Sequence, residues 1–146
     1  KRCIVPVDGF FEWREVGGRN YPHYIKMGDD SAFAIAGVWD SWRDEDTGDV
    51  RKTYSIITTP ANPLLEKIHN KKKRMPAILE TKDEKRWISE EVTREEIESM
   101  LKPYSEKELK AYPIKRMITK DVDDNVPEIL EPHEYEELKF EQKKLF

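Results

Sequence analysis

The sequence predicts an α+β protein in which a mainly antiparallel, barrel-like sheet is flanked by peripheral helices. Short runs rich in β-branched and aromatic residues fill the first half, and turn residues separate them. Several of these separations are short enough for hairpins, which favours antiparallel pairing over a βαβ pattern. In the second half, apolar residues recur at helical spacing within strongly charged segments.

Five strands are expected in the first half. The segments between them contain Gly, Asp or Asn, which favour turns because these residues tolerate left-handed backbone or hydrogen-bond to their own chain. The expected strands are residues 3–7 (CIVPV), 10–15 (FFEWRE), 21–27 (YPHYIKM), 33–42 (FAIAGVWDSW) and 53–59 (TYSIITT).

The second half is expected to hold helices and two further strands. Asn62 has the features of an N-cap, with Pro63 at the first helical position, and this short helix is expected to end at His69. Thr93 and Glu96 form a capping-box pattern for a later helix. The remaining expected elements are strands at 75–79 and 111–114, helices at 82–89 and 93–104, a loop at 117–129 and a helical tail at 132–146.

Length and cysteine content point to one domain in a reducing compartment. A chain of 146 residues ordinarily forms one domain around one core. Its single cysteine, Cys3, cannot close an intramolecular disulfide, and no apolar run approaches the length of about eighteen residues that a membrane span needs. We therefore expect no signal peptide, no membrane span and a protein that is cytoplasmic, or nucleoid-associated in a bacterium. We also expect a monomer.

The charge is unevenly distributed along the chain. A net charge of −4 argues against a general nucleic-acid binder. Residues 66–75 nevertheless hold five Lys/Arg against one Glu, whereas residues 121–141 hold nine Asp/Glu against one Lys. Because binding depends on the local field, one face could attract phosphate.

Glu12 stands between Phe11 and Trp13 in the middle of an expected strand. Strand alternation places Phe11 and Trp13 on one face and Glu12 with Arg14 on the other. Glu12 could simply face solvent, paired with Arg14 or with a lysine across the sheet. Alternatively, its face lines a cleft in which the carboxylate accepts and donates protons.

His69 ends a short helix just before a run of basic residues. The simplest interpretation is a C-terminal histidine that offsets the helix dipole, followed by a solvated loop. Alternatively, His69 is a proton donor beside a loop in which Lys73 and Arg74 hold an anionic substrate. Thr58, at a strand end that opens a helix, is either part of an ordinary cap region or a further anion contact.

No metal or cofactor site is expected. The three histidines, His23, His69 and His133, are scattered, and Cys3 lacks partners at zinc spacing. The sequence also contains no P-loop, no dinucleotide-binding glycine pattern and no serine elbow.

Three motifs follow one another along the chain: DGFFEW at residues 8–13, SIITTPAN at 55–62 and IHNKKKRMPAIL at 68–79. In this order and at these separations, they closely resemble the SRAP family (SOS response-associated peptidase domain). The resemblance extends from RCIVPVDGFFEW to VPEILEP, nearly the whole chain.

The resemblance implies a single barrel-like domain that binds single-stranded DNA and senses abasic sites. In the family, an N-terminal cysteine attacks the ring-opened sugar: its amine forms a Schiff base and its thiol then closes a thiazolidine. The same cysteine removes a short propeptide from its own chain. By motif, Glu12 matches the glutamate that positions the amine and transfers its proton, and His69 matches the histidine that acts as an acid at the sugar. The residues expected to contact DNA are Trp13, Thr58, Lys73 and Arg74.

The sequence departs from the family pattern in two places. The Met-Cys-Gly-Arg start and the downstream Asn-Ala-Arg segment are absent, so we expect residues 1–146 to be one SRAP domain without about the first third of it. Cys3 cannot be the nucleophile because its amine is in a peptide bond, and it is expected to be a small buried thiol. The loop between His69 and Arg74 is also longer than in the family pattern, because three lysines are inserted before Arg74.

Other functions are compatible with parts of the sequence. Trp13, Trp39 and Trp42 near a basic loop are typical of a noncovalent single-strand DNA-binding module. The acidic tail is typical of a protein-interaction domain, although nothing in the sequence identifies a partner. A protease that acts on other proteins is disfavoured because no Ser-His-Asp or Cys-His arrangement is present.

Overall fold

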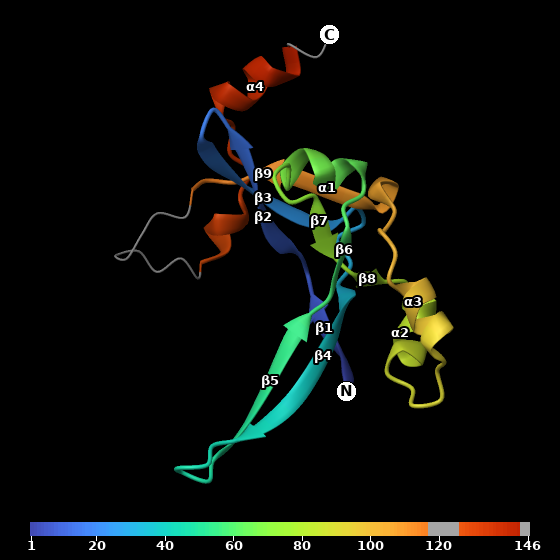
Figure 1. Cartoon of the computed structure of the whole chain (residues 1–146). Coiled ribbons are helices and arrows are strands. Elements are labelled where there is room, and N and C mark those ends of the chain that lie inside the picture. Colours follow the sequence, from blue (N-terminus) through green and yellow to red (C-terminus); the bar gives the residue numbers. More distant parts are fainter. Residues whose placement is uncertain (117–125, 144–146) are drawn as a thin grey trace.

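The computed structural model describes residues 1–116 and 126–143, and it divides the strands among three antiparallel sheets (Figure 1). The first sheet has the order β1-β4-β5, with β8 also paired to β4; the second has the order β2-β3-β9; and β6 pairs with β7. The strands are β1 (Arg2–Val7), β2 (Phe10–Val16), β3 (Arg19–Met27), β4 (Phe33–Arg43), β5 (Val50–Ile56), β6 (Thr58–Pro60), β7 (Arg74–Pro76), β8 (Ile78–Leu79) and β9 (Leu109–Pro113).

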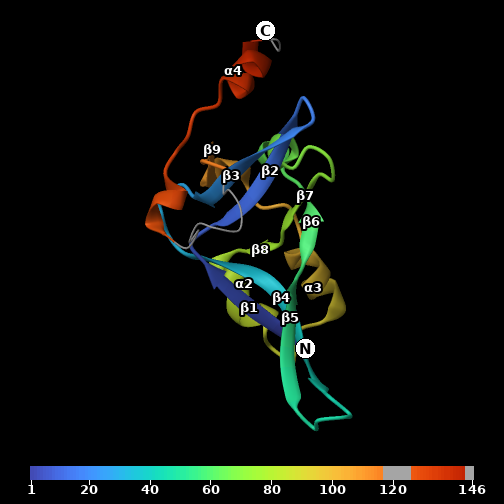
Figure 2. The same cartoon turned by 90° about the vertical axis from the view of Figure 1, so that its left-hand side faces the viewer.

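Helices lie at the periphery of these sheets, as the sequence predicts. The α-helices are α1 (Pro63–Ile68), α2 (Thr81–Trp87), α3 (Arg94–Met100) and α4 (Glu136–Lys143), and 3-10 turns occur at Glu106–Glu108 and Pro127–Leu130. Figures 1 and 2 show α2 and α3 beside the first sheet, α1 beside the second, and α4 projecting at the end opposite to the N-terminus. Most of the expected loop at 117–129 lies outside the described residues.

The expected α+β fold is confirmed, but the described strands do not close into a barrel. β5 forms one edge of its sheet, and the β4–β5 hairpin extends away from β2 and β3 in both views (Figures 1 and 2). Two expected strands are each divided where the chain passes between sheets, at Ile57 and at Ala77. There the Ala77 N–H donates to the Ile57 carbonyl at 2.8 Å, and the Ala36 N–H of β4 donates to the Ala77 carbonyl at 2.8 Å.

The β2–β3 hairpin has a two-residue turn that requires glycine. Gly17 and Gly18 have φ of +57° and +79°, and they connect Val16 to its pairing partner Arg19. Positive φ at both central positions defines the hairpin turn whose twist matches that of the strands, and β-carbons would disfavour it. The turn thereby fixes the register in which Glu12 lies opposite His23.

Two hydrophobic clusters hold the sheets and helices together. One joins α1 to the second sheet and to the start of β4, with Ile25, Phe33 and Leu65 among its buried members. The other joins α2 and α3 to β4, and Trp87 fills its centre. Burying side chains of this size stabilises each site by about 1.5–3 kcal/mol relative to exposure. Cys3 lies in β1 and is only half-buried.

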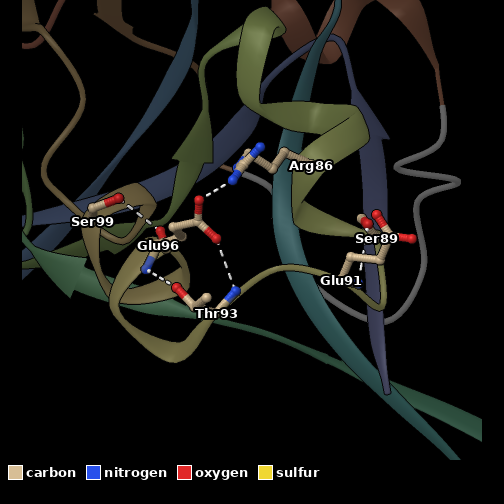
Figure 3. A network of polar contacts seen from close by, with 6 residues as sticks. All are labelled: Arg86, Ser89, Glu91, Thr93, Glu96 and Ser99. Carbon is tan, nitrogen blue, oxygen red and sulfur yellow. Dashed lines mark hydrogen bonds and ion pairs between the residues drawn. The ribbon is translucent and has the colours of Figure 1, made fainter.

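The expected capping box at the start of α3 is confirmed (Figure 3). The Thr93 hydroxyl accepts from the Glu96 N–H at 3.3 Å, and the Glu96 carboxylate accepts from the Thr93 N–H at 2.9 Å. The other Glu96 oxygen forms an ion pair with Arg86 of α2, so this one side chain also connects the two helices. Within the described residues, no helix is long and apolar enough to span a membrane.

Candidate active site

The structure brings Glu12 and His69 into contact, although 57 positions separate them in the sequence. The Glu12 Oε1 lies 3.4 Å from the His69 Nδ1. About one fifth of each side chain remains exposed, 21% for Glu12 and 20% for His69. Both groups are therefore shielded on most sides but can still be reached by a ligand.

Glu12 is positioned by its strand. Phe10, two residues earlier, packs against the core and meets Phe33 edge-on with 6.3 Å between the ring centres. Phe11 packs against Tyr24 of β3 on the opposite face, with 5.4 Å between the ring centres. These two anchors hold β2 on both faces, so the Glu12 carboxylate is presented from a rigid strand.

The cross-strand neighbour of Glu12 is His23, so the expected alternative of a lysine across the sheet does not apply. His23 is buried, and its Nδ1 lies 2.9 Å from the Tyr21 carbonyl oxygen. Burial lowers the pKa of His23 more than its hydrogen bond to the Tyr21 carbonyl raises it, and the charge of Arg14 lowers it further. The cross-strand neighbour of Glu12, His23, is therefore a neutral imidazole near pH 7.

His69 is positioned by the short helix α1. The Asn62 Oδ1 caps this helix by accepting from the Leu65 N–H at 2.9 Å, and Leu65 and Ile68 are buried. His69 is the C-cap, and its N–H donates to the Leu65 carbonyl at 2.7 Å. The expected helix end is confirmed, and the histidine at the helix C-terminus is the same residue that contacts Glu12.

The hydrogen bonds of His69 define its tautomer. Its Nδ1 lies 2.9 Å from the Arg74 carbonyl oxygen, and a carbonyl can only accept, so Nδ1 carries the proton. In the part of the chain that the structure describes, Nε2 has no hydrogen-bond partner. In neutral His69 the lone pair is therefore on Nε2, and in the protonated form Nε2 is a free donor.

Four basic side chains follow His69, and among the described residues only that of Lys71 has an ion-pair partner. Lys71 forms an ion pair with Glu15 of β2. The side chains of Lys72, Lys73 and Arg74 are exposed and have no ion-pair partner among the described residues. Lys73 adopts a left-handed φ of 49°, and its N–H donates to the His69 carbonyl at 2.8 Å, which closes the loop into a turn.

Three surface hollows on the described residues lie away from the pair of Glu12 and His69. One hollow is lined by Met27 and Phe33, a second by Met100 and Tyr104, and a third by Cys3 and Trp39, among other residues. None of these three includes Glu12 or His69.

Comparison with known proteins identifies the family. A family model described as "SOS response associated peptidase (SRAP)" matches residues 1–121, which is most of the chain. The chain belongs to the SRAP family. This confirms the resemblance found in the motifs around Glu12, Thr58 and His69.

Individual relatives match this SRAP chain along most of its length. "Abasic site processing protein YoqW" of Bacillus subtilis is 36% identical over 135 residues, covering 91% of this chain and 58% of YoqW. "Abasic site processing protein HMCES" of Gallus gallus is 30% identical, covering 92% of this chain and 44% of HMCES. A crystal structure of a Bacteroides thetaiotaomicron protein superposes with a TM-score of 0.83 at 41% identity, covering 91% of this chain and 57% of that protein. The chain thus spans little more than half the length of YoqW and of the Bacteroides protein.

Of the other residues that the sequence of this SRAP chain predicts for the site, Trp13 contacts the pair and Thr58 does not. Trp13 follows Glu12 in the chain and is 48% exposed, and its backbone N–H donates to the Glu12 Oε2 at 3.3 Å. Thr58 is exposed on β6, next to the β7 strand that begins at Arg74, but no described contact joins it to Glu12 or His69. Trp39 and Trp42 of the stacking hypothesis belong to β4, which is in a different sheet from the β2 strand that carries Trp13.

Sequence reasoning missed the contacts of Asn70 and the pairing of Lys71. Asn70 makes two hydrogen bonds with the backbone of Glu15, and Lys71 binds the Glu15 carboxylate. Asn70 and Glu15 lie 55 positions apart, and neither residue has a local signal that would identify the other. In the motif IHNKKKRMP, residue 70 is merely the position after the histidine.

Proposed function

We propose that this SRAP chain supplies the glutamate and the histidine of a site that attaches covalently to abasic sites in single-stranded DNA. The observation that carries the proposal is the contact between the Glu12 Oε1 and the His69 Nδ1 at 3.4 Å. A carboxylate and an imidazole at this separation provide one group that accepts a proton and one that donates it. The names of the relatives YoqW and HMCES, abasic site processing proteins, support the choice of substrate.

The proposed reaction joins an N-terminal cysteine, located outside residues 1–146, to the open-chain aldehyde of the sugar. The α-amine of the cysteine adds to the C1′ carbon, and loss of one water gives a Schiff base. The thiol then adds to the same carbon while its proton passes to the nitrogen, and a thiazolidine ring closes. Apart from the water, nothing leaves, and no oxidant or reductant is required. The same cysteine releases a short propeptide from its own chain, and peptidase activity is limited to that step.

Glu12 and His69 have complementary roles in this proposal. The Glu12 carboxylate takes the proton that the amine loses as it attacks. The protonated His69 donates from Nε2 to the sugar oxygen that leaves, because its Nδ1–H is held by the Arg74 carbonyl. A positioned acid or base of this kind typically contributes 10²- to 10⁴-fold, or about 3–5 kcal/mol of barrier.

The DNA strand would be held by the exposed residues around the pair. Lys73 and Arg74 are exposed cations without ion-pair partners among the described residues, and we assign them to DNA phosphates. Thr58 donates a hydroxyl to the same backbone, and the exposed Trp13 stacks on a base. The protein acts as a monomer on cytoplasmic or nucleoid DNA.

The test uses a chimera in which this chain replaces the segment of YoqW that it matches. We expect the chimera, like YoqW itself, to form a heat-stable adduct with single-stranded DNA that contains one abasic site. Residues 1–146 alone should form no adduct. Glu12→Gln and His69→Ala in the chimera should slow adduct formation or its reversal, while circular dichroism stays unchanged. A folded chimera that forms no adduct under conditions in which YoqW does would contradict the proposal.

A second candidate is a noncovalent single-strand DNA-binding module. It is favoured by the exposed indole of Trp13 and by the exposed side chains of Lys72, Lys73 and Arg74, which have no ion-pair partner among the described residues. Such a module would bind intact and abasic DNA equally, and its affinity would fall steeply with salt. Adducts that survive denaturation distinguish the two candidates.

A further inference from the structure

The side chain of Asn70 binds the outer edge of β2 as a neighbouring strand would. The Glu15 N–H donates to the Asn70 Oδ1 at 3.2 Å, and the Asn70 Nδ2 donates to the Glu15 carbonyl at 2.8 Å. β2 is an edge strand of its sheet, so the backbone groups on its outer side have no partner strand among the described residues. A carboxamide has both an acceptor and donors, so it can satisfy both backbone groups at once.

The next residue strengthens the same connection. Lys71 forms an ion pair with the Glu15 carboxylate. Two consecutive loop residues therefore hold one strand residue through its N–H, its carbonyl and its side chain. Surface ion pairs contribute little on their own, so the two hydrogen bonds of Asn70 are the directional part of this connection.

The link between Asn70 and Glu15 lies close in the chain to both residues of the candidate active site, His69 and Glu12. Asn70 follows His69 directly, and Glu15 is three residues from Glu12 on the same strand, a span of about 10 Å. α1 has only six residues, and a five-residue loop, residues 69–73, connects it to β7. Loops of this kind are ordinarily the mobile parts of a fold. The link from Asn70 to Glu15 restrains this loop relative to the strand that carries Glu12.

We propose that Asn70 is a positioning residue that holds His69 against Glu12 and in a single tautomer. By fixing the loop, it keeps the His69 Nδ1–H directed at the Arg74 carbonyl and leaves Nε2 for the substrate. The geometric part of this inference stands on the contacts alone. Its consequence for catalysis rests on the proposed function of the site.

The geometric part is tested by NMR of residues 1–146 labelled with ¹⁵N at histidine. At about pH 9, where imidazole side chains are neutral, the His69 nitrogen shifts should report a single tautomer protonated at Nδ1. Asn70→Ala should convert these shifts to the averaged values of a mixture of tautomers. Asn70→Asp keeps an acceptor for the Glu15 N–H but loses the donor, and it should give a smaller change.

Lys72→Ala is the control within the same loop. Lys72 has no side-chain partner among the described residues, so its removal should leave the His69 shifts as in the unmodified chain. His69→Ala identifies the signals of this imidazole among those of the three histidines. If Asn70→Ala and Asn70→Asp both retain the fold and the original His69 shifts, the inference is wrong.

The catalytic consequence is tested separately in the YoqW chimera. A small misplacement of a reacting group can cost about 100-fold, so Asn70→Ala should slow adduct formation by about 10- to 100-fold without weakening the affinity for DNA. Unchanged kinetics together with altered His69 shifts would restrict Asn70 to a structural role and overturn the catalytic part. If the unmodified chimera forms no adduct while the His69 shifts still respond to Asn70, the proposed function fails and the positioning role stands.

Discussion

The stability of α1 depends on its N-cap, Asn62, and this helix holds its C-cap residue, His69, in place. Asn62 is only 4% exposed and makes two hydrogen bonds through its side chain. Its Oδ1 accepts from the Leu65 N–H at 2.9 Å, and its Nδ2 donates to the Tyr104 carbonyl at 2.8 Å. Asn62→Ala removes both bonds and leaves the Leu65 N–H buried without a partner.

The size of the effect follows from these two bonds. Loss of a helix N-cap costs about 1 kcal/mol, and loss of a bond that leaves a partly buried carbonyl unsatisfied costs about 1–2 kcal/mol more. We therefore expect Asn62→Ala to lower the free energy of unfolding by about 2–3 kcal/mol. With a urea dependence of about 2 kcal/mol per molar, the midpoint should fall by roughly 1–1.5 M.

Urea unfolding of residues 1–146, followed by tryptophan fluorescence and circular dichroism, measures this change. The matched control is Asn20→Ala, since Asn20 is exposed on β3, and a surface substitution should change the free energy by no more than about 0.5 kcal/mol. A loss below about 0.5 kcal/mol for Asn62→Ala, equal to the control, would refute the assignment of this residue as the cap that fixes α1.

Two further predictions concern protons and phosphates. Burial lowers the pKa of His23 in the folded protein. As the pH falls below about 6.5, His23 is therefore protonated in the unfolded chain before it is protonated in the folded one. The free energy of unfolding decreases over this range, down to the lowered pKa of the folded state. His23→Phe should therefore make the free energy of unfolding less dependent on pH between about 7 and 5 in urea titrations, and an unchanged dependence would contradict a buried, neutral His23. The affinity for single-stranded DNA falls as the salt concentration rises. Replacing Lys73 and Arg74 by Ala should make the plot of log affinity against log salt concentration less steep, by about 0.7 for each phosphate that these side chains neutralise. The control replaces the exposed Lys85 and Lys107 by Ala, which removes the same charge, and it should leave the slope unchanged. Equal slopes for the two double variants would exclude a specific phosphate site in the loop.

Much of the fold follows from local sequence. The expected strand at 33–42 is β4 at Phe33–Arg43, and the expected strand at 10–15 is β2 at Phe10–Val16. These elements are predictable because alternation, aromatic content and turn residues agree within each segment. The divisions at Ile57 and Ala77 are not predictable in this way, since they depend on backbone hydrogen bonds between two sheets whose packing no local pattern specifies.

The candidate site is predictable only in part. The family motifs identify Glu12 and His69, and the structure brings these two residues together. The restraint on the histidine loop comes from Asn70 and Glu15, which are 55 positions apart and have no shared pattern. Likewise, four adjacent basic residues look equivalent in the sequence, and only the fold shows that Lys71 is paired with Glu15.

The central claim is that the Glu12 carboxylate and the His69 imidazole act together on one sugar. The most direct measurement is a double-mutant cycle on the rate of adduct formation by the YoqW chimera with abasic single-stranded DNA. Glu12→Gln and His69→Ala should each slow the reaction by about 100-fold or more, and the double variant should be within about threefold of the slower single variant, because residues that act as a unit are not additive. Single variants that react at the unmodified rate, or rate reductions that multiply in the double variant, would contradict the account.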